Sequence, residues 1–141
     1  AKVFSAVPMH RFSDEYTQRE ASAALSEGTV ALFACGIGSP FFSTDTAVAL
    51  RAVEMGADAI LLAKNVDGVY DSDPNVNPDA TFIPDISYQE AQRRDLKVMD
   101  AAALAVCREN SVPVLCVFGL KEPENILRAA HGERLGTLVH P

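Results

Sequence analysis

TVALFACGIGSPFFSTDTAVALRAVEM, residues 29–55, joins an apolar run of strand length to a loop of small residues and then to an alanine-rich helical pattern. An almost uninterrupted apolar run is typical of a parallel strand that is covered on both faces. The loop therefore opens directly onto a helix N-terminus, where free backbone N–H groups and a partial positive charge attract anions. Hydroxyl groups of Ser43, Thr44 and Thr46 add donors. This stretch predicts a site for a phosphate-bearing ligand.

Strand and helix signals alternate along the rest of the chain. Strands are expected at residues 2–7, 29–34, 59–63, 113–118 and 137–139, and helices at 17–27, 44–55, 99–110 and 123–131, with a short helix capped by Ser87. Residues 65–84 are rich in Asp, Asn, Gly and Pro and predict an extended excursion with turns. The alternation predicts an α/β fold, a mostly parallel sheet with helices on both faces.

Ligands bind beyond the carboxyl ends of strands in such sheets. Two unusual loops, residues 35–46 and 64–74, leave predicted strands at that end. If the two strands are neighbours, their loops share one crevice.

Composition narrows the class of protein. A length of 141 residues with 48% hydrophobic residues fits one globular domain with a real core. The net charge of -7 argues against a nucleic-acid partner, because the phosphates would be repelled. No apolar run has membrane-spanning length, so no membrane partner is expected. Three cysteines without CxxC spacing predict buried thiols and a cytoplasmic location.

The loop over residues 35–46 has two interpretations. Its glycines would allow a tight turn, with Thr44 or Asp45 as an ordinary helix N-cap. However, Phe41 and Phe42 are large aromatics where a structural turn favours small polar residues, and they could form a wall against a flat base. A carboxylate such as Asp45 at the start of a helix stabilises that helix by up to about 1 kcal/mol, so its presence needs no catalytic role. Beside bound phosphates it would need to orient a cation, which indicates phosphoryl transfer.

The loop over residues 64–74 is equally ambiguous. Its carboxylates do not follow the spacing of an EF-hand, so a calcium site is rejected. One interpretation is a solvated hairpin with Asp67-Gly68 as its turn. The other places Tyr70 against a purine and Asp73 on a ribose hydroxyl, with Lys64 neutralising phosphate. Residue chemistry alone leaves both interpretations open.

Three segments resemble the bacterial uridylate (UMP) kinases of the amino acid kinase family. They are GIGSPFFSTDTAVALRAVEMGADAILLAKNVDGVYDSDP from Gly36, DLKVMDAAALAVCRENSVPVLCVF from Asp95, and the closing GERLGTLV. The resemblance spans essentially the whole chain and implies the amino acid kinase fold, which is similar to that of carbamate kinase. It also implies transfer of the γ-phosphoryl group from ATP, accompanied by Mg²⁺, to UMP. A homohexamer is implied as well.

Site residues carried over from the resemblance fall into three groups. UMP would be contacted by Ile37, Gly38, Ser39, Pro40, Phe41, Phe42, Ser43 and Thr44. ATP would be bound by Lys64, Asn65, Tyr70 and Asp73. Asp45 would be the catalytic residue that organises the cationic groups around the transferring phosphate, and no residue is expected to bind a metal directly.

The sequence also departs from the family pattern. Family members carry upstream a Lys-x-Ser-Gly loop and further glycine-rich segments that cradle the ATP phosphates, and these are absent here. Residues 1–141 are therefore expected to be the C-terminal portion of an amino acid kinase domain, with little or no activity alone. Ser39 and Ile37 stand where Asn and Thr are usual. Two alternatives remain, an amino-acid or carbamate kinase of the same fold and a non-catalytic oligomer that binds nucleotide or oxyanion.

Overall fold

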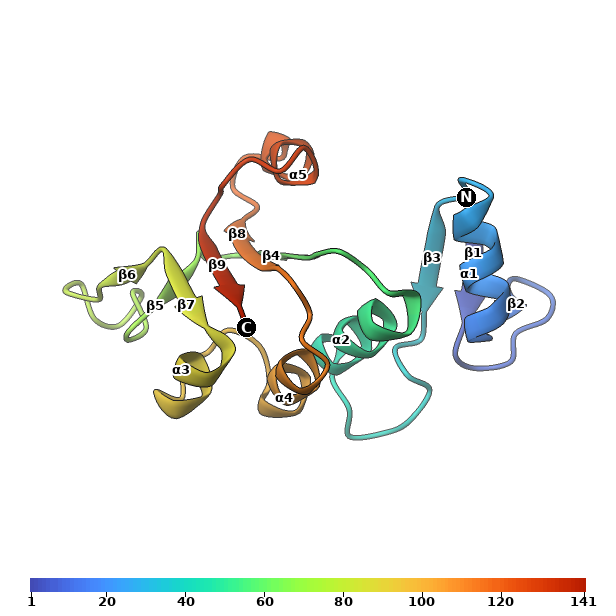
Figure 1. Ribbon diagram of the computed structural model, residues 1–141, viewed down its shortest axis with the longest axis horizontal. Coiled ribbons are helices and arrows are strands. Elements are labelled where there is room, and N and C mark those ends of the chain that lie inside the picture. Colours follow the sequence, from blue (N-terminus) through green and yellow to red (C-terminus); the bar gives the residue numbers. More distant parts are fainter.

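The computed structural model describes residues 1–141 as nine strands and five helices (Figure 1). The strands are β1 (Lys2–Ser5), β2 (Asp14–Glu15), β3 (Ala31–Ala34), β4 (Ile60–Lys64), β5 (Val69–Tyr70), β6 (Phe82–Ile83), β7 (Asp85–Ser87), β8 (Leu115–Gly119) and β9 (Thr137–His140). The helices are α1 (Gln18–Ser26), α2 (Thr44–Met55), α3 (Tyr88–Arg93), α4 (Ala101–Glu109) and α5 (Glu124–Ala130). The predicted α/β class is confirmed, and none of the helices is long and apolar enough to cross a bilayer.

The strands form three separate sheets. One has the order β2-β1-β3 and is parallel, and a second has the order β4-β8-β9-β7, with β8 and β9 antiparallel. The third is the small antiparallel pair of β5 and β6. The short strands β2, β6 and β7 were not expected from the sequence. The turn of the small hairpin lies after Tyr70, so the interpretation with Asp67-Gly68 as the turn is wrong.

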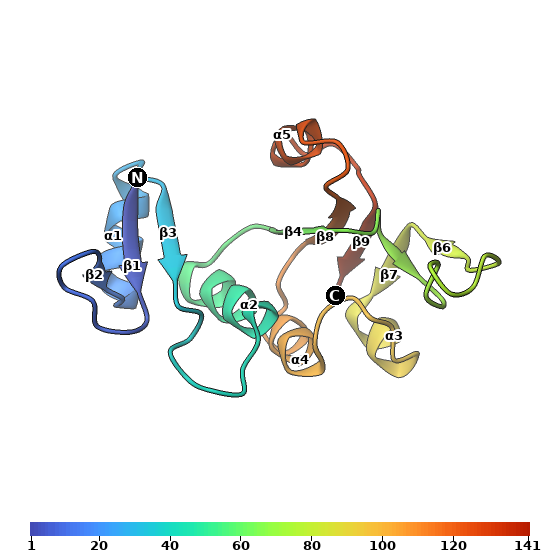
Figure 2. The ribbon, with the colours of Figure 1, turned by 180° about the vertical axis from the view of Figure 1, so that it is seen from behind.

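The two strands that precede the candidate loops are not neighbours, so the condition stated for a shared crevice is not met. β3 ends one sheet and β4 ends another, so each leaves one edge unpaired. Helix α2 and its connections lie between the two sheets in both opposite views (Figures 1 and 2). Large apolar side chains near these edges stay exposed, with Leu32 at 50% and Leu61 at 41%.

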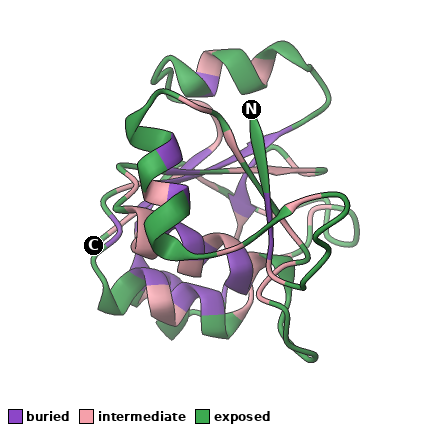
Figure 3. Ribbon diagram, turned by 90° about the vertical axis from the view of Figure 1, so that its right-hand side faces the viewer, coloured by how far each residue is buried: buried purple, intermediate pink, exposed green.

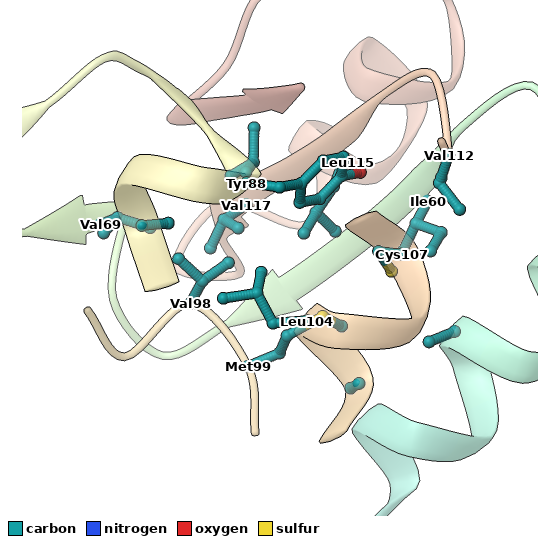
Figure 4. Close-up of a cluster of buried hydrophobic side chains, with 14 of the residues drawn as sticks. Ile60, Val69, Tyr88, Val98, Met99, Leu104, Cys107, Val112, Leu115 and Val117 are labelled. Carbon is teal, nitrogen blue, oxygen red and sulfur yellow. The ribbon is translucent and has the colours of Figure 1, made fainter. Parts of the chain in front are cut away.

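The main core lies between the four-stranded sheet and helices α2, α3 and α4 (Figure 4). Strand β8 is buried along its whole length. Because side chains alternate across a strand, Leu115 and Val117 enter this core while Cys116 and Phe118 pack with Ala129 of α5 on the opposite face. Helices therefore cover both faces of this sheet, as predicted. Figure 3 shows the first strand passing from exposed to buried along its length.

Local signals explain where the helices begin and end. Thr17 Oγ1 accepts a hydrogen bond from the Glu20 N–H, and Ser87 Oγ accepts one from the Glu90 N–H, so both expected caps are present. Gly56 ends α2 in the left-handed conformation, at a φ of 62°, which glycine adopts without steric cost. These signals set where α1 and α3 begin and where α2 ends.

Cysteine exposure corrects one expectation and supports a prediction. Cys107 and Cys116 are buried, but Cys35 is exposed. Burial raises the pKa of Cys107 to about 11 and also raises that of Cys116, which lowers the reactive thiolate fraction of Cys107 on the order of 100-fold.

We expect a thiol reagent at pH 8 to label one cysteine of the folded protein rapidly and the other two only after unfolding. Cys35→Ser should remove the rapid phase, and two rapid phases would contradict the assignment.

Candidate active site

The N-terminus of α2 is capped by Ser43. Its Oγ accepts hydrogen bonds from the backbone N–H groups of Asp45 at 3.1 Å and Thr46 at 3.3 Å. The structural interpretation of the loop had expected Thr44 or Asp45 as the N-cap. That expectation is wrong, because the cap is Ser43. Thr44 is exposed, and its hydroxyl group makes no hydrogen bond within the protein. The carboxylate of Asp45 is consequently free of a capping role.

Asp45 faces a cation that comes from the end of β4. Its Oδ2 lies 3.9 Å from Nζ of Lys64 and accepts a 3.2 Å hydrogen bond from the backbone N–H of Asp100. Both side chains of the ion pair are about a quarter exposed, so the pair is open to a ligand. The two candidate loops therefore meet at Asp45 and Lys64, although their strands belong to different sheets.

Lys64 has a second partner. Its ammonium group donates a 2.6 Å hydrogen bond to the carbonyl oxygen of Val98. The cation is thus held between α2 and the segment that leads into α4. A lysine fixed in this way places a positive charge beside the helix N-terminus, where it offsets the repulsion between the Asp45 carboxylate and an incoming phosphate.

The loop between Gly36 and Ser43 exposes its aromatic side chains. Phe41 is fully exposed and has a φ of 70°, and Phe42 is 55% exposed. Gly38 has a φ of 75°, and a Cβ there would lie 2.7 Å from the carbonyl oxygen of Ala6, so only glycine fits. Ile37 is half-buried, whereas Ser39 and Pro40 are exposed. The loop thus presents two exposed aromatic rings directly before the N-terminus of α2.

A cavity of about 310 Å³ lies beside the second loop. It is lined by twelve residues that include Tyr70, Asp73 and Lys97. The Tyr70 hydroxyl donates a 2.8 Å hydrogen bond to Asp67, which raises the pKa of Tyr70. The Tyr70 ring meets Phe82 edge to face, with centroids 5.5 Å apart. The cavity therefore has a fixed aromatic ring, Tyr70, and a carboxylate, Asp73, on its wall, which are groups suited to the base and the ribose of a nucleoside.

The other two residues assigned to ATP lie outside that cavity. Lys64 is at Asp45 and Val98, as described, and Asn65 is exposed. Asp73 itself accepts two hydrogen bonds on Oδ1 from the backbone and side chain of Asn75, which fixes the rim of the cavity. The structure therefore brings Tyr70 and Asp73 together on one cavity and sets Lys64 apart, beside Asp45.

Arg51 contacts the first candidate loop, over residues 35–46, and was not identified from the sequence. It is only 8% exposed, forms a 2.6 Å ion pair with Glu54, and stacks 3.6 Å from the centroid of the Tyr16 ring. Its Nη2 also donates a 3.4 Å hydrogen bond to the carbonyl oxygen of Gly36. Arg51 is the one arginine of α2 and stands in its alanine-rich stretch between Ala47 and Val53, which is the signal that could have identified it. Lys97 lies on the cavity wall and was not assigned a role from the sequence, where it is only part of the segment from Asp95 that carries the family resemblance.

The sequence model described as the amino acid kinase family matches residues 5–117. This chain belongs to the amino acid kinase family. The match includes β3, the candidate loops, α2, α4 and part of β8. Membership of the amino acid kinase family accounts for the alternation of strands and helices and for the glycine-rich segment that opens onto α2.

Individual relatives of this amino acid kinase chain carry names that agree with the resemblance. It is 48% identical over 138 residues to a protein of Arabidopsis thaliana named chloroplastic uridylate kinase PUMPKIN. Its structure matches the UMP kinase of Ureaplasma parvum with a TM-score of 0.90 at 38% identity, and that of Bacillus anthracis with a TM-score of 0.92 at 36% identity.

The matched relatives are longer than this chain. The match covers 98% of this chain but 40% of the Arabidopsis protein. It covers 99% of this chain but 60% and 57% of the two bacterial chains. The 141 residues therefore span about half the length of the relatives that they resemble.

Proposed function

We propose that the protein to which this chain belongs transfers the γ-phosphoryl group of ATP to UMP, giving UDP and ADP. One observation carries the proposal. The carboxylate of Asp45, at the N-terminus of α2, faces the ammonium group of Lys64 at 3.9 Å, where the two candidate loops meet. The relatives named as uridylate and UMP kinases support UMP as the acceptor.

Phosphoryl transfer needs positioning and charge neutralisation more than covalent catalysis by the protein. In this proposal, residues 37–44 contact UMP and are called the acceptor loop. The phosphate of UMP meets the backbone and the free Thr44 hydroxyl at the start of α2. Tyr70 and Asp73 hold the adenine nucleotide, with Lys64 and Asn65 toward its phosphates. Asp45 keeps Lys64 aligned without itself touching the phosphates. Mg²⁺ enters with ATP as part of the substrate.

The domain assignment is part of the same proposal. Residues 1–141 form the C-terminal portion of an amino acid kinase domain, and the remaining polypeptide of the complete protein supplies further phosphate-binding groups. The net charge of -7 gives this portion no general attraction for ATP. A homohexamer, implied by the family resemblance, and a cytoplasmic location, suggested by the unpaired cysteines, complete the proposal. The mass of the complete protein in solution tests the assembly.

The decisive experiment is a coupled assay of the complete protein with MgATP and a panel of acceptors. We expect turnover with UMP and at least about 100-fold lower kcat/KM with glutamate, aspartate or carbamate, because a site built for one acceptor leaves its polar groups unpaired with another. The chain of residues 1–141 serves as a control and should show little or no turnover. Preference for an amino acid or carbamate would reject the proposal, and so would nucleotide binding without turnover.

A further inference from the structure

Asp100 is the side chain on which the N-termini of two helices converge. It caps α4, because its Oδ1 accepts a 2.8 Å hydrogen bond from the Ala103 N–H. The same carboxylate accepts hydrogen bonds from the hydroxyl groups of Ser43 and Thr46, at the start of α2. One carboxylate therefore ties the start of α2 to the start of α4.

The chain around Asp100 contacts both members of the Asp45–Lys64 pair and reaches the cavity beside the second loop. The backbone N–H of Asp100 binds Asp45, and the carbonyl oxygen of Val98 binds Lys64. Lys97 lies on the wall of the cavity that Tyr70 also lines. Residues 97–100 thus run from the cavity lined by Tyr70, the proposed nucleotide cavity, to the start of α2. Along the way they contact both Asp45 and Lys64.

The hydrogen bonds at Asp100 also determine whether the hydroxyl groups of Ser43 and Thr46 can donate to a ligand. Burial opposes ionisation of Asp100, but hydrogen bonds from Ser43, Ala103, Thr46 and Ala102 outweigh it and hold the pKa of the carboxyl below its usual value. An ionised carboxylate only accepts hydrogen bonds, so both hydroxyl protons are committed to Asp100. The Ser43 hydroxyl also accepts hydrogen bonds from two backbone N–H groups, so it has no hydrogen-bonding capacity left for a ligand.

We propose that Asp100 is a positioning residue for phosphoryl transfer, which holds the acceptor loop and the Asp45–Lys64 pair in one arrangement. This inference rests on the proposed function. Asp100 does not touch the substrates. It acts by orienting the first turn of α2 through Ser43 and Thr46, and by presenting its own backbone N–H to Asp45. Losing that arrangement misplaces the reacting groups, and a displacement of about 1 Å at such a site can reduce the rate about 100-fold.

The test is Asp100→Asn in the complete protein. Asparagine is as good a helix N-cap as aspartate, so α4 stays capped. Its uncharged amide is a weaker acceptor for the hydroxyl groups of Ser43 and Thr46. We expect kcat with UMP to fall about 10-fold to 100-fold, while KM for MgATP stays within about twofold, because the nucleotide cavity keeps its walls.

Two comparisons separate positioning from a general loss of stability. Ser87→Ala removes the cap of α3, away from the site, and should lower the unfolding midpoint with kcat unchanged. Thr46→Val should reproduce part of the Asp100→Asn loss, because it removes a hydroxyl that donates to Asp100. Thr46→Ser, which keeps the hydroxyl, should recover most of it.

The outcomes are distinct. An inactive wild-type protein rejects the proposed function. An active wild-type protein whose Asp100→Asn variant turns over UMP as fast as Ser87→Ala rejects the role of Asp100, and so does equal activity of Thr46→Val and Thr46→Ser.

Discussion

Replacing Asp45 by asparagine in the complete protein should lower kcat about 100-fold or more while KM for UMP changes by no more than about threefold. The carboxylate holds Lys64 at 3.9 Å and accepts the Asp100 N–H. Asparagine has nearly the same shape and can still accept that N–H, but it does not attract the ammonium group. A group that aligns charge for the transition state affects kcat more than it affects binding of the ground state.

Steady-state kinetics with UMP and MgATP measure this effect, and Asp58→Asn provides the matched control. Asp58 is exposed and lies beyond the other end of α2, so it undergoes the same chemical change away from the site. A helix-dipole role alone would cost Asp45→Asn at most about 1 kcal/mol of stability and leave kcat intact. Equal kcat values for the two variants would reduce Asp45 to that role.

Gly136→Ala is expected to be the most destabilising single substitution considered for this chain. Gly136 has a φ of 60°, and an added Cβ would lie 2.0 Å from the carbonyl oxygen of Val117 and 2.6 Å from that of Asp67. Both neighbours are backbone, so neither can move as a flexible side chain does. Separating β8 from the loop after β4 combines overpacking with strain, and we expect a loss of about 4 kcal/mol or more in unfolding free energy.

Gly132→Ala isolates the part of that loss that comes from backbone conformation. Gly132 has a φ of 81°, but nothing lies within 4 Å of its added Cβ. Its substitution should cost only about 1 kcal/mol, since strain is its sole penalty. Chemical denaturation of both variants, monitored by circular dichroism, gives the two values. Similar losses would show that the close approach at Gly136 relaxes freely.

The sequence predicted the α/β class and all five helices, because periodicity and capping are local properties. The identity of the α2 cap was not predictable in the same way. Ser43, Thr44 and Asp45 are three adjacent residues that all favour an N-cap. Ser43 is selected by its contact with Asp100, which is 57 residues away in the sequence. The strands β2, β6 and β7, of two or three residues, were missed because they are too short to carry a pattern and are strands only through pairing with a neighbour.

The candidate site was predictable to a similar extent. The acceptor loop and Asp45 follow from a glycine-rich segment before a helix, and Tyr70 and Asp73 follow from the family resemblance, although their roles remain predictions. Arg51 and Asp100 were not assigned a role, because the contacts that link them to the loop over residues 35–46 join residues far apart in the sequence. The separation of β3 from β4 was also not predictable, since a strand–helix–strand pattern does not specify whether the two strands are adjacent.

The open edges of β3 and β4 have a practical consequence for anyone who produces these 141 residues alone. An open row of backbone donors and acceptors, flanked by apolar side chains such as Leu32 and Leu61, is a template for strand addition between molecules. At high concentration, copies of the isolated polypeptide would add to one another at these edges and precipitate. Crystallisation and spectroscopy are therefore better attempted with the complete protein.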